Sequence, residues 1–274
     1  MNICTAVGAK TTEVRRGLAI DLGSSRTRIW APGWKTPLDL PSSVSAGGEV
    51  VRPVRRGRVV DPAACADMLR QFLPSGTRLS CPRPVVVLSR PVLAGPDHRA
   101  AVTEALSVLR PSAVVVIDSA RAAAGTAAGA GAGAYDERPL LVVDVGADLL
   151  EVTLLACGSV TDARQAEIGL RDIGPMAPGS PSTLVEAAVG MVEDMLRRDK
   201  DGAMTGALRR GPLLVGGGAV RGDLRGQLAA RLRTPVRASP APSTAVVRGA
   251  ASALLSVLRH PGSAPWPRTH SGTT

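Results

Sequence analysis

Residues Gly17–Trp30 read GLAIDLGSSRTRIW, and residues Leu140–Leu155 read LLVVDVGADLLEVTLL. Each stretch is an apolar run that ends in an Asp-x-Gly turn, at Asp21 in the first and at Asp144 in the second, and then continues as another apolar run. The two aspartates lie 123 residues apart. A repeat with so long a period predicts two similar halves that face each other across a cleft.

Other short, β-branched runs are bounded by turn residues, and most lack a clean alternation of apolar and polar residues, which is typical of strands buried on both faces. The expected strands are Leu18–Leu22, Arg28–Trp30, Pro84–Leu88, Ala113–Ile117, Leu140–Val145, Glu151–Ala156 and Leu213–Val215. Amphipathic patterns predict helices over 61–72, 97–109, 182–196, 220–232 and 243–258. Strands that alternate with helices indicate an α/β fold with a largely parallel sheet.

Composition excludes several classes of protein. The chain has 274 residues and a formal charge of +10, with 33 Lys and Arg against 23 Asp and Glu. Three tryptophans, one tyrosine and one phenylalanine are too few to form a stacking platform for single-stranded nucleic acid, so a nucleic-acid partner is not expected. No apolar stretch is long enough to span a membrane, and four scattered cysteines indicate a reduced, cytoplasmic chain.

The two Asp-x-Gly turns have the chemistry of a phosphate site. A glycine lets backbone N–H groups approach a phosphate closely, so Gly23, Ser24, Ser25 and Gly146 are candidate phosphate contacts. Mg²⁺ prefers one or two carboxylates together with phosphate oxygens, so Asp21 and Asp144 are candidates to hold it through water. One such turn alone is also a common hairpin connection, and the repeat is what favours a functional interpretation.

Two further turns follow strands. Leu213–Val215 leads into Gly216, Gly217 and Gly218, a geometry that suits close packing of a nucleoside against backbone, although a flexible β–α turn looks the same in sequence. The strand that ends at Ile117 is followed by Asp118 and a helix of small residues. Asp118 is a candidate to orient an attacking water or, equally, a residue that caps the helix. Small residues in that helix allow another helix to pack closely against it.

These four elements, in this order, resemble the actin-like nucleotide-binding superfamily, and most closely the MreB/Mbl family of bacterial cell-shape proteins. The segment from Asp21 to Thr27 resembles the family's first phosphate loop, and Asp144–Val152 resembles its second. The other similar segments are Val54–Asp61, Asp97–Ala105, Ile117–Gly125, Gly216–Gly218 and Pro242–Gly249. The resemblance covers roughly Gly17 to Leu258.

The resemblance implies an actin-like (ribonuclease H-like) α/β fold with duplicated domains around a nucleotide cleft that holds ATP and Mg²⁺. Residues 17–136 and 240–260 are expected to form the first lobe and residues 137–239 the second, with flexible tails at 1–16 and 261–274. The outer subdomains are expected to be reduced or missing, because only roughly Pro32–Arg52 is available for the first and one helix directly follows the Pro- and Gly-rich segment 174–181 in the second.

Three positions depart from the family pattern. Asp148 places a carboxylate in the second loop where a phosphate is expected, and like charges about 4 Å apart repel by about 4 kcal/mol at an effective dielectric of 20. The family's water-positioning Glu falls near Asp118 or Ser119, which are shorter. Arg28, seven residues after Asp21, is at a spacing from which a basic residue reaches the phosphates in other members of the superfamily, although an outward-facing strand residue has the same pattern.

We therefore expect an MreB-like cytoskeletal or scaffolding protein of cell shape and cell-wall morphogenesis that binds ATP weakly and hydrolyses it slowly or not at all. The resemblance implies self-association into filaments, and it suggests an anionic membrane surface and cell-wall synthesis proteins as further partners. Two alternatives stay open. One is an active small ATPase or kinase of the same fold, and the other is an Arg-rich binder of the membrane surface.

Overall fold

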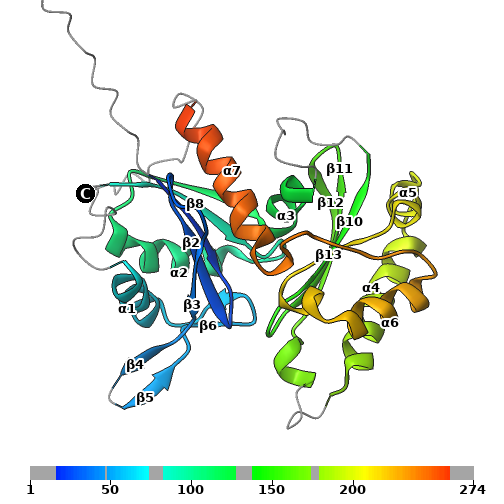
Figure 1. The fold of residues 1–274 in the computed structure, drawn as a ribbon, viewed down its shortest axis with the longest axis horizontal. Coiled ribbons are helices and arrows are strands. Elements are labelled where there is room, and N and C mark those ends of the chain that lie inside the picture. Colours follow the sequence, from blue (N-terminus) through cyan, green and yellow to red (C-terminus); the bar gives the residue numbers. More distant parts are fainter. Residues whose placement is uncertain (1–16, 47, 74–82, 128–137, 174–178, 260–274) are drawn as a thin grey trace, which may run out of the picture.

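The computed structural model describes residues 17–46, 48–73, 83–127, 138–173 and 179–259. Two five-stranded sheets lie beside each other, each with helices on its outer face (Figure 1). The tails expected at 1–16 and 261–274 lie outside the described residues. No helix within the described ranges combines the length and the apolar character needed to cross a membrane.

The first sheet has the strand order β3-β2-β1-β8-β9, with β1 at its centre. Strand β1 pairs antiparallel with β2 and parallel with β8, which pairs parallel with β9. The strands are β1 (Gly17–Leu22), β2 (Arg26–Trp30), β3 (Leu38–Pro41), β8 (Val85–Arg90) and β9 (Ala113–Asp118). Two helices, α1 (Pro62–Phe72) and α2 (Pro96–Leu106), pack on its outer face.

The second sheet repeats this plan in the order β12-β11-β10-β13-β14. Its central strand β10 pairs antiparallel with β11 and parallel with β13, as β1 does with β2 and β8. The strands are β10 (Leu140–Val145), β11 (Leu150–Ala156), β12 (Ser159–Ala166), β13 (Leu213–Val215) and β14 (Arg237–Ala238). Helices α4 (Pro181–Arg197), α5 (Ala203–Arg210) and α6 (Gly222–Leu232) complete this half. The internal repeat read from the sequence is therefore present in the fold.

Helices α3 (Ser119–Ala127) and α7 (Ala245–Arg259) lie between the sheets and pack against each other (Figure 1). They approach so closely at Gly249 that a Cβ there would overlap the carbonyl oxygen of Ala122. The small residues of α3 thus allow the close helix packing that the sequence predicted. Helix α7 contacts β1 and β8 of the first sheet, and α3 also contacts β10 of the second, so this helix pair lies where the two sheets meet.

The central strands are buried on both faces, which explains why their sequences lack simple alternation. In β1, Leu18 and Ile20 belong to the core that includes α1 and α2, whereas Ala19 belongs to a core with Ala250 and Leu254 of α7. Full burial of one Leu or Ile side chain contributes about 1.5–3 kcal/mol to folding. These two cores hold the Asp21 end of β1 in place.

The outer additions are small. In the first half they are two hairpins, formed by β4 (Val44–Ala46) with β5 (Glu49–Val51) and by β6 (Val54–Arg55) with β7 (Arg58–Val59). In the second half, α5 follows α4 and no further sheet occurs between them among the described residues. The reduced outer subdomains agree with the expectation from chain length.

Candidate functional site

A cavity of about 320 Å³ lies where the β1–β2 and β10–β11 turns of the two sheets meet. Its volume is at the lower end of the range for small-molecule sites, about 300–1,000 Å³. Most of the candidate residues line it, and they come from both halves of the chain. These are Asp21, Gly23, Ser24, Ser25, Arg28, Asp144, Gly146, Gly216 and Gly217.

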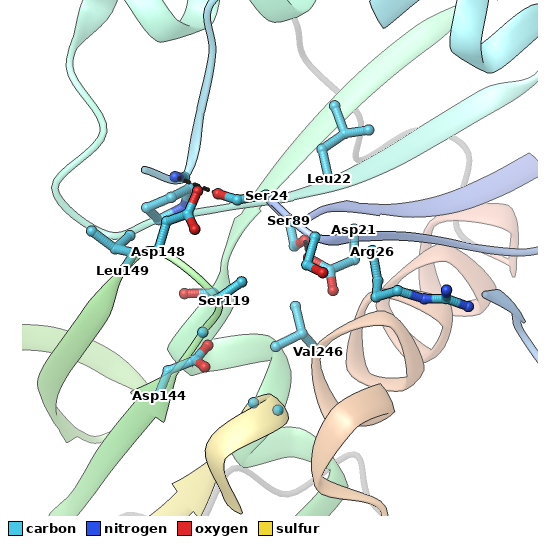
Figure 2. A pocket seen from close by; sticks show the side chains of 18 of the residues that line it. Asp21, Leu22, Ser24, Arg26, Ser89, Ser119, Asp144, Asp148, Leu149 and Val246 are labelled. Atoms are coloured by element: carbon cyan, nitrogen blue, oxygen red, sulfur yellow. Dashed lines mark hydrogen bonds between the residues drawn. The ribbon is translucent and has the colours of Figure 1, made fainter. Parts of the chain in front are cut away.

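Asp21 and Asp144 project into this cavity from opposite sheets (Figure 2). Burial raises the pKa of Asp144 to about 7, and the negative charge of Asp21 adds to the shift. Burial also raises the pKa of Asp21, although Arg28 and a hydrogen bond from Ser89 Oγ at 2.8 Å oppose the rise. No described residue donates a hydrogen bond to the Asp144 carboxylate. The site therefore holds two carboxyl groups whose negative charge is poorly compensated.

Gly216 makes room for the Asp144 carboxylate. Its φ is +82°, a conformation that L side chains rarely adopt, and a Cβ at this position would overlap Asp144 Oδ1. Gly217 also lines the cavity, but Gly218 does not. Gly218 is buried instead, and a Cβ at this position would overlap the side chain of Val145.

Asp118, the candidate to orient an attacking water, is not among the residues that line the cavity. It is the last residue of β9, and its carboxylate pairs with Arg90 Nε on the neighbouring strand at 3.2 Å. The next residue, Ser119, lines the cavity in its stead. Successive positions at a strand end point in different directions, and the acidic residue occupies the one that points at Arg90.

Arg28 is not an outward-facing strand residue. Its side chain is 13% exposed, lies 3.8 Å from Asp21 Oδ2 and 3.4 Å from Asp39 Oδ2, and lines the cavity. In β2 it stands directly opposite Asp21 in the antiparallel register. The equivalent position opposite Asp144 in the second sheet is Glu151.

Glu151 is the principal cavity residue that motif reasoning missed. Its Oε1 accepts a hydrogen bond from the backbone N–H of Val92 at 2.8 Å, and its Oε2 accepts one from Ser119 Oγ at 3.3 Å. Burial and the nearby Asp144 raise its pKa to about 8. The internal repeat contained the signal, because Glu151 follows Asp144 at the same spacing of seven at which Arg28 follows Asp21.

Asp148 lies in the second turn as expected, but its charge is paired. Both carboxylate oxygens accept hydrogen bonds from Arg171 Nη1 at 3.0 Å. Nη2 of the same arginine donates to the backbone oxygen of Ser24 at 3.0 Å. Arg171 thereby connects the first turn to the second across the cavity, a link that sequence spacing alone does not reveal.

Arg56 makes a second link between the halves. It lies in the β6–β7 turn and donates to the backbone oxygens of Asp148 and Glu167 and to the carboxylate of Asp172. The adjacent Gly57 donates its N–H to Ser24 Oγ at 3.1 Å, and a Cβ on Gly57 would lie 2.7 Å from Leu149 Cδ2. Contacts among these three turns therefore join the two halves beside the cavity.

Comparisons with known proteins agree with this geometry. The family model described as MreB/Mbl protein matches residues 43–173. The crystal structure of MreB5 of Spiroplasma citri bound to ADP matches with a TM-score of 0.76 at 13% identity, over 90% of this chain and 98% of that chain. The AMPPNP-bound structure of the same protein matches with a TM-score of 0.72 at 14% identity over the same shares.

A third solved structure is the ethanolamine utilization protein EutJ from Carboxydothermus hydrogenoformans. It matches with a TM-score of 0.55 at 14% identity, over 86% of this chain and 89% of that chain. At such identities a likeness of structures shows the fold. Together these matches confirm the expected actin-like α/β fold.

Proposed function

We propose that this chain, which has an actin-like fold and matches the MreB/Mbl family model over residues 43–173, binds ATP with Mg²⁺ in the cavity between the sheets. In this proposal residues 17–136 and 240–260 form one lobe and 137–239 the other. The protein serves as a cytoskeletal or scaffolding component of cell-wall morphogenesis, with slow or lost hydrolysis. The observation that carries the proposal is the convergence of Asp21 and Asp144, from opposite sheets, on one cavity.

The carboxylates fit a divalent cation. Burial raises the pKa of both acids, and the charge of Asp21 raises that of Asp144 further, so a bound positive charge would stabilise both ionised carboxylates. Mg²⁺ takes one or two carboxylates together with phosphate oxygens. Asp21 and Asp144 would hold Mg²⁺ through water, and the ion would supply positive charge to neutralise the phosphates.

The remainder of the cavity suits a nucleotide. At one end of the cavity Ser24 and Ser25 would offer backbone N–H groups to phosphates, whereas the N–H groups of Gly23 and Gly146 donate to Arg26 O and Leu149 O and so shape the two turns. At the other end Gly216, Gly217 and Val246 would provide a close-packed surface for the nucleoside. MreB5 was crystallised with ADP and with AMPPNP, and its fold resemblance supports the same class of ligand here.

Slow hydrolysis follows from the groups near Ser119. A hydroxyl there takes the place of the family's water-positioning acid, and Asp118 is held by Arg90. Glu151 is nearby, but a carboxyl group with a pKa raised to about 8 is mostly protonated at pH 7 and is then a poor base. The cleft is therefore better suited to holding ATP than to turning it over.

Filament formation, association with anionic membrane surfaces and contact with cell-wall synthesis proteins are the further parts of this proposal. They rest on the family resemblance and on the arginine-rich composition, with its formal charge of +10. The proposed place of action is the cytoplasm, at the membrane surface.

We expect the purified chain to bind Mg²⁺-ATP and to release phosphate very slowly, so that binding is not followed by steady turnover. The measurement is single-turnover phosphate release alongside sedimentation of assemblies formed with Mg²⁺-ATP. Ordinary multiple turnover that Asp144→Asn abolishes would contradict the proposed loss of hydrolysis. Asp67→Asn is a suitable control, because Asp67 is exposed on α1 away from the cavity.

A further inference from the structure

Arg171 stands between the two phosphate turns. It donates to both oxygens of Asp148 in the second turn and to the backbone oxygen of Ser24 in the first, all at 3.0 Å. Figure 2 shows Ser24 and Asp148 close together and away from Val246, the residue against which we propose that the nucleoside packs. The guanidinium therefore lies at the phosphate end of the cavity.

The Arg171 guanidinium has N–H groups that are not used in contacts with the described residues. Of its five N–H groups, Nε–H and one hydrogen of Nη2 donate to no residue in the described part of the chain. Arg171 lines the cavity, and its side chain is 39% exposed. An arginine with this geometry can donate hydrogen bonds to a phosphate without first breaking all of its protein contacts.

Asp148 holds Arg171 in place by accepting its hydrogen bonds. The Asp148 side chain is 11% exposed, and a buried carboxylate without a counter-charge is unfavourable, so the pair is stabilised as a unit. The turn lacks the extra glycines and threonines with which the family's second loop would provide donors to a phosphate. The guanidinium of Arg171, held at the same place, can provide hydrogen-bond donors instead.

We propose that Arg171 binds the terminal phosphate of the nucleoside triphosphate, and that Asp148 is a positioning residue that holds Arg171 and competes with that phosphate. This inference rests on the proposed ATP site. It adds a preference for ATP over ADP, because a guanidinium at the far end of the phosphate chain contacts only a triphosphate. When the terminal phosphate binds, it accepts hydrogen bonds from Arg171, and the ion pair between Arg171 and Asp148 weakens.

The test is calorimetric titration of the full chain with Mg²⁺-ATP and, separately, Mg²⁺-ADP. Arg171→Ala should weaken ATP binding about 10- to 100-fold, as expected for lost hydrogen bonds to a charged group, and leave ADP binding nearly unchanged. Arg171→Lys keeps the charge without the planar fork and should recover part of the ATP affinity. Arg221→Ala removes the exposed Arg221–Asp223 pair on α6 and serves as the matched control.

Asp148→Asn gives the second arm. It should strengthen ATP binding when Arg171 is present. In the double variant that also carries Arg171→Ala, it should have no such effect. Equal losses of ATP and ADP affinity in Arg171→Ala would indicate that Arg171 only braces the turns, and would overturn this inference alone. Absence of binding of either nucleotide to the wild-type chain would overturn the proposed function as well.

Discussion

Gly249→Ala is expected to lower the free energy of unfolding by about 2–3 kcal/mol, the upper part of the range for overpacking. A Cβ at this position would overlap the carbonyl oxygen of Ala122 and approach Ala122 Cα to 2.8 Å. Because these are backbone atoms of α3, no side-chain rotation relieves the overlap, and the helices must separate. Chemical denaturation of the full chain measures the change.

Gly190→Ala is the matched control. Gly190 is also inside a helix, α4, but it is exposed and a Cβ there has no neighbour within 4 Å. Alanine has the better helix propensity at both positions, so Gly190→Ala should stabilise the chain by about 0.5–1 kcal/mol. The same sign of effect for the two substitutions would show that α3 and α7 do not pack through Gly249.

The ligand-free chain should lose stability as pH rises from about 5 to about 8. Burial raises the folded pKa of Asp144 to about 7 and of Glu151 to about 8, whereas both groups titrate near 4 in the unfolded chain. The folded state therefore binds more protons in this window, and the free energy of unfolding falls as they are lost. Denaturation curves at several pH values measure this slope.

Isosteric amides isolate the two groups. Asp144→Asn and Glu151→Gln cannot ionise, so each should flatten the decline and leave the ligand-free chain more stable than wild type at pH 8. Asp67→Asn, which alters an exposed carboxylate on α1, should leave the slope as it is. A slope that neither amide changes would mean that these carboxyl groups are hydrated in the folded protein.

The sequence predicted the parts of the fold that local patterning controls. The buried strands around Asp21 and Asp144 and the longer helices were recognisable, because burial on a sheet or a helix face leaves a periodic or continuous apolar signal. Strand β12 was missed because its residues are partly exposed and mostly polar. Helix α5 was missed because it is short and ends in two arginines.

The site was predictable where it depends on turns and unpredictable where it depends on distant side chains. Asp-x-Gly turns fix the backbone locally, so Asp21, Gly23, Asp144 and Gly146 were found. The pairing of Arg171 with Asp148 depends on how a segment 23 residues away returns to the second turn. Such contacts are set by tertiary packing and leave no periodic signal in the chain.

The account depends most on the claim that the two sheets present one shared site for a magnesium nucleotide. Titration of the full chain with ATP, in Mg²⁺ and then in EDTA, tests it directly when Asp21→Asn and Asp144→Asn are titrated in parallel. We predict saturable one-to-one binding that requires Mg²⁺ and that either substitution weakens about 10- to 100-fold, as for residues that orient a metal through water. Absence of binding to the wild-type chain, or binding that ignores both substitutions, would contradict the account.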